Sequence, residues 1–231
     1  MDLSGANMKI RDITEAEANT PNAREIAAKL RAAGYKKLGS GVDSTVWAKD
    51  EQSVIKILMP DETTSQAENI FLKFYEFCQA HQDIDCLPKF KDISGAHHTT
   101  FVIGDTEYRQ IAMERLQPIK RNTFEEAMVW ILSDFANKQV KWEDVIPHLE
   151  AVDTWQHSEG FMKQMPAIIA QKKNDPEFNA VYGTLFTVMQ VLYLTGKINK
   201  FGWDLHTENV MQRKNGTLVI IDPWFAMNEG T

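Results

Sequence analysis

The fold of this chain is decided by the stretch Asp204-Leu205-His206-Thr207-Glu208-Asn209, which follows a long apolar helical pattern and precedes strand-like residues. Thirteen residues after Asn209, Asp222 stands at the end of the apolar segment 218–221. A carboxylate in such a place is costly to bury unless a cation or hydrogen-bond donors compensate it. Asn209 and Asp222 offer the oxygen ligands that Mg²⁺ prefers. The spacing therefore predicts a magnesium site formed by these two side chains.

Two further signals lie in the first half of the chain. The stretch Leu38-Gly39-Ser40-Gly41-Val42-Asp43-Ser44-Thr45-Val46 places glycines at alternate positions between two strand-like segments. Such a backbone can turn tightly and approach an anion closely, although a glycine-rich hairpin alone is more often a simple turn. Lys56 lies in the β-branched run Val54-Ile55-Lys56, where a lysine either reaches the surface or meets an anion.

Hydrophobic periodicity gives the two halves different characters. The first half reads as a small sheet with one internal helix, and the second half reads as mostly helical, with a boundary near 117–122. The predicted helices are 21–33, 66–80, a helix after the capping box Thr123/Glu126, 144–157, 161–172 and a long helix that starts at Asp175-Pro176 and ends at Gly196. The predicted strands are 35–38, 45–48, 53–58, 99–104, 109–116, 210–212 and 218–221.

In order, the chain shows G-x-G-x-x-S-x-V, V-I-K, a helix with a glutamate, D-L-H-x-x-N and I-D-P. Over about residues 36–226 this set resembles the protein-kinase-like fold, with its glycine loop, strand lysine, helix glutamate, catalytic loop and metal-binding aspartate. The resemblance implies a two-lobed α+β fold. Residues 1–19 would be a flexible segment, 20–116 a small antiparallel-sheet N-lobe with one key helix, and 117–231 a shortened, mostly helical C-lobe.

The resemblance also implies an ATP site. Lys56 would pair with the α- and β-phosphates, and a helix glutamate, Glu68 or Glu76, would pair with Lys56. We prefer Glu68 because its helix face adjoins the apolar stripe, although either glutamate alone reads as a solvated charge. The other implied ATP-binding residues are Gly39, Ser40, Gly41, Ser44 and Val46 in the loop, and Met113, Glu114 and Leu116 in a hinge-like segment.

The catalytic roles follow from the same resemblance. Asp204 would accept the proton of the substrate hydroxyl, and Asn209 and Asp222 would hold Mg²⁺. His206 occupies the place of the catalytic-loop lysine of protein kinases. It would contact the γ-phosphate there, but a lone histidine is as often a structural hydrogen-bonding residue.

The chain departs from protein kinases around this loop. Gly202 and Trp203 replace the histidine and arginine of H-R-D, so activation through a phosphorylated loop is not expected. Pro223 follows Asp222 and restrains its backbone, which predicts that Asp222 does not flip out of the site. The sequence ends nine residues after Asp222, from which we expect no activation segment and a minimal, constitutively competent kinase.

Two groups resemble this arrangement: the serine/threonine kinases encoded by short-tailed lytic coliphages, and the aminoglycoside, fructosamine and choline kinases. The interpretation that we favour is a phage-type serine/threonine kinase acting on protein hydroxyls. A small-molecule kinase with an acidic pocket for cationic substrates would also fit. The acidic residues concerned, which a solvated helix face also explains, are Asp134, Glu143, Asp144, Glu150, Asp153 and Glu159. A non-catalytic kinase-like regulatory or binding module and a nucleotidyl transferase are less favoured interpretations of the same motifs.

The composition fits a globular protein. Of 231 residues, 43% are hydrophobic and 25% are charged, which excludes a mostly disordered chain. The net charge of −7 argues against a broad basic surface for nucleic acid. Cys78 and Cys86 read as buried, reduced thiols. With no apolar run of about 20 residues and no leader-like start, we expect no membrane span and a cytoplasmic location, in the host cytoplasm if the chain is phage-encoded. The sequence does not indicate an oligomeric state.

Overall fold

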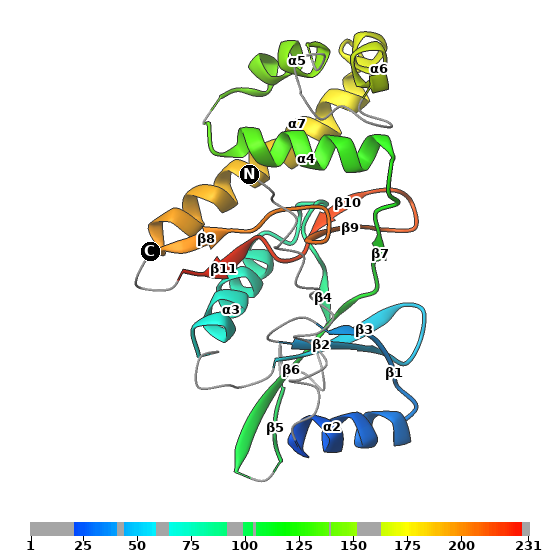
Figure 1. Ribbon diagram of the computed structural model, residues 1–231, viewed down its shortest axis with the longest axis vertical. Coiled ribbons are helices and arrows are strands. Elements are labelled where there is room, and N and C mark those ends of the chain that lie inside the picture. The colour runs from blue at the N-terminus through cyan, green and yellow to red at the C-terminus, as the bar shows by residue number, and fades with distance from the viewer. Residues whose placement is uncertain are drawn as a thin grey trace, which may run out of the picture. The chain divides into compact units, whose positions relative to one another are not determined.

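The computed structural model describes residues 21–40, 44–58, 65–91, 99–103, 105–138, 140–151 and 163–227. The chain divides into two compact units (Figure 1). Unit 1 comprises Met1–Asn69 and Lys89–Arg115, and unit 2 comprises Ile70–Pro88 and Leu116–Thr231. The predicted lobes, 20–116 and 117–231, differ from these units mainly at Ile70–Pro88. The predicted flexible segment, residues 1–19, lies outside the described residues.

Unit 1 is built on an antiparallel sheet. Its strands run in the order β1-β2-β3-β6-β4, and β5 pairs with β6 beside them. The bounds are β1 (Lys36–Ser40), β2 (Ser44–Ala48), β3 (Ser53–Leu58), β4 (Phe90–Lys91), β5 (Thr99–Ile103) and β6 (Thr106–Glu114). In the turn between β2 and β3, Asp50 Oδ1 accepts the backbone N–H groups of Gln52 and Ser53 at 2.7 and 2.8 Å. These two hydrogen bonds hold the pKa of Asp50 below its ordinary value.

The helix α2 (Pro21–Ala32) covers part of this sheet (Figure 1). Proline at its first position suits a helix start, and its Ile26 is buried among Trp47, Ile55 and other sheet residues. After the helix, Gly34 has a left-handed φ of +86° and Tyr35 N–H donates to the Leu30 carbonyl at 2.9 Å. This turn is a typical glycine stop after a helix, and it directs the chain into β1.

Unit 2 is mostly helical. The helix α3 (Ser65–Ala80) begins in unit 1 and belongs to unit 2 from Ile70 onward. The remaining helices are α4 (Phe124–Ala136), α5 (Trp142–Glu150), α6 (Met165–Lys172) and α7 (Pro176–Ile198). The predicted helices 144–157 and 161–172 correspond to α5 and α6, and the predicted residues between 152 and 162 lie outside the described part of the chain.

Residues 70–88 belong to unit 2 because their contacts run to its C-terminal strands. Phe74, which is fully buried, meets Trp224 edge to face with ring centroids 6.0 Å apart. The N–H of Ile220 donates to the Cys86 carbonyl at 3.0 Å. The Arg213 guanidinium donates to the carbonyls of Asp85 and Leu87. A helix and its following turn, close to the sheet in sequence, are thereby incorporated into the second core.

The helix α4 starts at the predicted capping residue. Thr123 Oγ1 accepts the Glu126 N–H at 3.4 Å. The Glu126 carboxylate accepts the N–H of Asn122, a residue with a left-handed φ of +58°. In a standard capping box the Glu126 side chain would accept the N–H of the N-cap residue, Thr123. Here it accepts the N–H of the preceding residue, Asn122.

An aromatic cluster joins α4, α5 and α7. The ring of Tyr182 in α7 lies edge to face with Phe124 of α4, with centroids 5.7 Å apart. Trp142 of α5 packs against Phe178, and its Nε1–H donates to Asn179 Oδ1 at 2.8 Å. Burial, with a smaller contribution from Glu125, raises the pKa of Tyr182 above its usual range. Such large buried rings contribute much of the packing that holds these helices together.

The helix α7 begins as predicted and ends later than predicted. Asp175 Oδ1 accepts the N–H of Glu177 at 2.9 Å, and Pro176 takes the first helical position. Gly196 does not end the helix, which continues to Ile198. The glycine is instead required by packing, because a Cβ at Gly196 would lie 2.7 Å from Nε1 of the buried Trp224.

Five short strands complete unit 2. They form two antiparallel groups, β10-β9-β7 and β11-β8. Their bounds are β7 (Gln117–Pro118), β8 (Phe201–Trp203), β9 (Val210–Gln212), β10 (Leu218–Ile220) and β11 (Trp224–Ala226). The sequence predicts β9 and β10 but not β7, β8 or β11, since two or three residues are too few to show a periodicity.

The predicted α+β class is confirmed, with a small antiparallel sheet in unit 1 and a mostly helical unit 2, and the elements follow the order expected of a kinase-like chain. Cys78 and Cys86 are buried and form no disulfide, as predicted. Among the described helices, none combines the length and the hydropathy that a membrane crossing would require.

The packing of α7 predicts different effects for two glycines of one helix. Gly196→Ala should lower the free energy of unfolding by about 1–3 kcal/mol, because the added methyl group meets the fixed Trp224 indole. Gly183→Ala is the matched control. Its Cβ would lie 3.4 Å from Trp142, an ordinary contact, so helix propensity should make it neutral or stabilising by up to about 1 kcal/mol. Urea denaturation of both variants measures the difference, and equal stabilities would contradict the packing role of Gly196.

Candidate functional site

The residues predicted to bind nucleotide in unit 1 meet in one row across the sheet. Gly39 of β1 pairs with Val46 of β2, Val46 pairs with Lys56 of β3, and Lys56 pairs with Ile111 of β6. Paired residues of antiparallel strands present their side chains on the same face. Val46 and the half-buried Lys56 therefore lie on the same face of the sheet. Gly39, which has no side chain, is in register with them.

The glycine loop begins with an irregularity in β1. The register shifts between Lys37 and Gly39, which leaves Leu38 as an extra residue with 48% of its surface exposed. Ser40 is exposed at the end of the strand, and Ser44 is buried at the start of β2. Gly41 lies outside the described residues, so its predicted contact with phosphate stays a prediction.

The hinge-like segment follows β6. Met113 is buried, and the N–H of Glu114 donates to the Lys89 carbonyl at 2.9 Å while a Glu114 carboxylate oxygen accepts the Lys89 N–H at 2.8 Å. The backbone N–H of Glu114 is therefore used within unit 1. The segment ends at the buried Leu116. The predicted contacts of this segment with ATP would have to use its other groups, and they stay a prediction.

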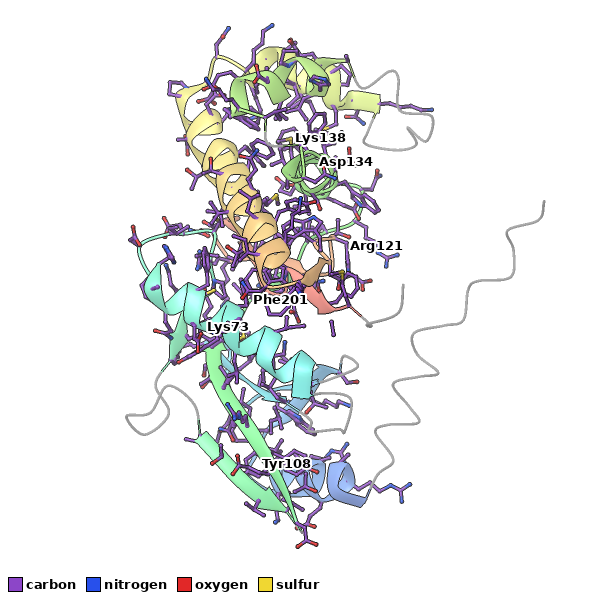
Figure 2. The ribbon with its side chains drawn as sticks, turned by 90° about the vertical axis from the view of Figure 1, so that its left-hand side faces the viewer. Lys73, Tyr108, Arg121, Asp134, Lys138 and Phe201 are labelled. Carbon is purple, nitrogen blue, oxygen red and sulfur yellow. The ribbon has the colours of Figure 1, made fainter. Side chains whose placement is uncertain are left out.

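Of the two glutamates considered as the partner of Lys56, Glu76 has another described partner and the Glu68 side chain is not described. Glu76 is on an exposed part of α3, and its carboxylate lies 3.1 Å from the ammonium of Lys73, which is labelled in Figure 2. This surface pair accounts for Glu76 as a solvated helix charge. The backbone of Glu68 is part of α3, but its side chain is not among those that the structure describes. The choice of Glu68 stays a prediction.

Two backbone hydrogen bonds bring the predicted catalytic loop and Asp222 together in unit 2. The N–H of Asp204, at the start of the loop, donates to the Pro223 carbonyl at 2.9 Å. The N–H of Ile221 donates to the carbonyl of Asn209, at the end of the loop, also at 2.9 Å. Asp222 is thus held between two residues that are each bonded to one end of the loop.

The side chain of Asn209 closes the loop from within. Its Nδ2 donates to the backbone oxygen of Asp204 at 2.6 Å and to Asp204 Oδ2 at 3.1 Å. Because both hydrogens of Nδ2 are used, the 3.3 Å approach of His206 Nε2 is a close contact and not a third hydrogen bond. In this amide orientation Nδ2 forms the hydrogen bonds to Asp204. Oδ1, the atom of the amide that suits a metal, does not take part in them.

His206 is oriented by the backbone of the loop. Its Nδ1 accepts the Glu208 N–H at 3.2 Å, so in the neutral ring the hydrogen belongs on Nε2. Nε2 lies 3.7 Å from Asp204 Oδ1, too far for a hydrogen bond, and the two side chains are 41% and 44% exposed. The imidazole therefore neighbours the carboxylate without bonding to it. Its predicted contact with the γ-phosphate stays a prediction.

The loop is also attached to α4. Ser133 Oγ donates to the Leu205 carbonyl at 2.5 Å, and Trp203 Nε1–H donates to Ser133 Oγ at 3.3 Å. The Leu205 side chain is buried, with 5% of its surface exposed. The sequence singles out Trp203 only as a departure from H-R-D. It gives no signal for Ser133, whose partners lie about seventy positions away in the chain.

The glycine in place of the H-R-D histidine has a packing reason. Gly202 pairs with Phe225 in the β8–β11 ladder, and the ring of Phe225 lies over the glycine. A Cβ at Gly202 would overlap that ring. A histidine is therefore incompatible with this position unless Phe225 moves.

Three of the acidic residues considered for a cationic pocket, Asp134, Asp144 and Glu150, have structural partners. Asp134 pairs with Lys138 on α4 at 2.9 Å, and both are labelled in Figure 2. Glu150 of α5 pairs with Lys173 at 2.8 Å. Asp144 accepts the Lys141 N–H at the start of α5, and Glu143 is exposed. Asp153 and Glu159 lie outside the described residues. The described carboxylates thus fit helix surfaces and helix caps.

The predicted magnesium ligands fit the ion by their chemistry. Asn209 and Asp222 supply an amide oxygen and a carboxylate, and both donors suit Mg²⁺, which usually takes few protein ligands besides water and phosphate. In the described part of the chain, no three histidine, cysteine, aspartate or glutamate side chains gather into a group that could hold a metal ion by themselves. Any metal here would therefore depend on further oxygen ligands, such as phosphate.

No protein-family model and no curated protein sequence matches the chain. Solved structures with similarity include a microcompartment-associated aminopropanol kinase, with 12% identity and a TM-score of 0.41 over 86% of this chain and 68% of that one. An amicoumacin kinase matches with 12% identity and a TM-score of 0.40 over 90% and 65%. An aminoglycoside phosphotransferase from Alicyclobacillus acidocaldarius matches with 15% identity and a TM-score of 0.33 over 83% and 64%. Likenesses this loose do not indicate what this chain binds.

The geometry of the loop predicts the tautomer of His206. At a pH where the ring is neutral, Nε2 should carry the hydrogen, because Nδ1 accepts the Glu208 N–H. Two-bond ¹H–¹⁵N correlation spectra of the imidazole distinguish the two nitrogens directly. A majority of the Nδ1–H form would contradict the described hydrogen bond. His148 is the internal comparison, since its Nδ1 lies 2.9 Å from the Asp144 carbonyl and should carry the hydrogen.

Proposed function

We propose that this chain is an ATP- and Mg²⁺-dependent phosphotransferase that passes the γ-phosphate to an alcohol hydroxyl. The observation that carries the proposal is the double attachment of Asp222 to the loop Asp204–Asn209. A base and a metal ligand that must act on the same phosphate have to keep a fixed separation. Hydrogen bonds on both sides of Asp222 provide that constraint between the two carboxylates.

Asp204, Asn209 and Asp222 of unit 2 each have a part in this reaction. The Asp204 carboxylate orients the acceptor hydroxyl and takes its proton as the acceptor oxygen bonds to the γ-phosphorus and the bond from phosphorus to the bridging oxygen breaks. Asn209 Oδ1 and the Asp222 carboxylate would hold Mg²⁺, which would supply positive charge beside the phosphates. Asn209 Nδ2 keeps the base in place through its bond to Asp204 Oδ2.

The residues of unit 1 bind the nucleotide in this proposal. The Lys56 ammonium pairs with the α- and β-phosphates, and the backbone of the Gly39 region approaches the phosphates closely because no side chain stands there. Val46 offers an apolar surface to the base. Support comes from the single row that contains Gly39, Val46 and Lys56.

The acceptor is either a protein hydroxyl, as in phage-type serine/threonine kinases, or a small molecule, as in aminoglycoside-type kinases. Incubating the protein with γ-³²P-ATP and a cell lysate separates these classes. Labelled protein bands support the first, and label in a soluble metabolite supports the second. Label transferred from α-³²P-ATP would replace the proposal with nucleotidyl transfer.

The role of Asp204 predicts the effect of its removal. Asp204→Ala should reduce phosphate transfer on the order of 10²–10⁴-fold while ATP binding stays within a few-fold, because the carboxylate acts on the acceptor. Glu177→Gln, which changes an exposed carboxylate in the first turn of α7, is the matched control and should transfer at the wild-type rate. Transfer by Asp204→Ala at the control rate would refute the assignment.

The role of Asp222 predicts a change in nucleotide binding. Mg²⁺ and ATP together should raise the melting temperature of the wild type, because a ligand that binds only the folded chain stabilises it. Asp222→Ala should lose the part of this rise that depends on Mg²⁺, and Asp83→Asn, an exposed acid of unit 2, should keep it. An unaltered rise in Asp222→Ala would contradict the ligand role. No rise in the wild type would favour a non-binding module.

A further inference from the structure

We propose that Ser133 is a positioning residue that fixes the orientation of Asp204 by holding both of its neighbours in the chain. The proposal rests on the function proposed above, because it gives Ser133 a role in a reaction that Asp204 carries out. Ser133 lies in α4, outside the loop and outside every motif of the sequence.

One hydroxyl group makes both connections. Ser133 Oγ donates its only hydrogen to the Leu205 carbonyl at 2.5 Å and accepts the Trp203 indole N–H at 3.3 Å. A serine hydroxyl has one donor and two acceptor lone pairs, so both bonds form at once. Residues 203 and 205 are thereby hydrogen-bonded to the same atom, Ser133 Oγ. Asp204 lies between these two residues in the chain, so both of its neighbours are held in place.

Ser133 is mounted on a rigid part of unit 2. Val129, Leu132 and Ala136, on the same helix, are fully buried. A serine within a helix usually bonds the carbonyl four residues before it. The hydroxyl of Ser133 instead donates to a residue 72 positions away, so it contributes to tertiary structure and not to its own helix.

The partners of Ser133 are themselves fixed. Trp203 meets Tyr193 of α7 edge to face, with centroids 5.6 Å apart and an interplanar angle of 84°. The N–H of Asp204 is bonded to the Pro223 carbonyl. The Asp204 backbone is therefore held at three successive residues, by α4 at residues 203 and 205 and by the Asp222 segment at residue 204.

This arrangement gives a physical role to the departures from H-R-D. Gly202 has no side chain with which to hold the loop, and Trp203 has no guanidinium. In this chain the indole N–H of Trp203 donates to Ser133 Oγ, and the serine hydroxyl donates to the Leu205 carbonyl. A misplacement of about 1 Å at a reacting group can cost about 100-fold in rate, so this bridge has a kinetic consequence.

The test is a split between kcat and KM, measured as hydrolysis of Mg·ATP with water as the acceptor. Ser133→Ala should lower kcat about 10- to 100-fold and leave KM for ATP within about twofold. Ser133→Thr, which keeps the hydroxyl, should restore most of kcat. Thr187→Ala is the matched control, because it removes a hydroxyl-to-carbonyl bond of 2.8 Å from α7. A kcat of Ser133→Ala equal to that of Thr187→Ala overturns the proposal.

A double-mutant cycle tests whether Trp203 acts through Ser133. Trp203→Phe removes the indole N–H and keeps an aromatic ring. It should lower kcat in the wild type but have no further effect in Ser133→Ala, because the acceptor of its hydrogen bond is already gone. Fully additive effects would show that the two residues act separately, which overturns the bridge.

Amide hydrogen exchange tests the bridge without any turnover. In Ser133→Ala, the amides of Asp204 and Asn209, which donate to Pro223 and His206, should exchange several-fold faster than in the wild type or in Thr187→Ala. Unchanged exchange would overturn the positioning role. If the wild type neither binds nor turns over ATP, the proposed function fails, and the exchange result still decides whether Ser133 orders the loop.

Discussion

The pair of backbone hydrogen bonds from Asp204 to Pro223 and from Ile221 to Asn209 is the constraint on which the rest of unit 2 depends. Both ends of a six-residue loop are joined to one short segment, so the loop cannot move without Asp222. The strands on either side extend this connection, since β8 pairs with β11 and β9 pairs with β10. Trp224 of β11 links these strands to the helices, because its buried indole N–H donates to the Leu192 carbonyl of α7 at 2.9 Å.

Much of this site is predictable because its information is local in the chain. The interval from Asp204 to Asn209 and the short step to Asp222 place three polar residues beside β9 and β10, two short strands that are close in the chain and pair with each other. The row of Gly39, Val46 and Lys56 follows similarly from three consecutive antiparallel strands, whose tight connections limit the possible registers. Local strand pairing thus accounts for both groups of proposed functional residues.

What the sequence does not predict depends on contacts between distant segments. Ser133 is one polar residue in an apolar helix, and only the folded chain brings it to Leu205. From the sequence, Gly196 is predicted to end its helix, because glycine is common just after helix ends. In the structure, glycine is required at this position because the Trp224 ring of β11 leaves no room for a Cβ. The assignment of Ile70–Pro88 to unit 2 likewise rests on Phe74 and Cys86 meeting the C-terminal strands. In each case tertiary packing overrides the local pattern.

The contact between Gly202 and Phe225 couples the residues that these two positions can hold. A side chain at position 202 overlaps the present place of the aromatic ring, so it requires the half-exposed Phe225 side chain to turn away. A smaller residue at 225 would remove this overlap. The two positions should therefore be epistatic, because the effect of a side chain at 202 depends on the residue that pairs with it at 225.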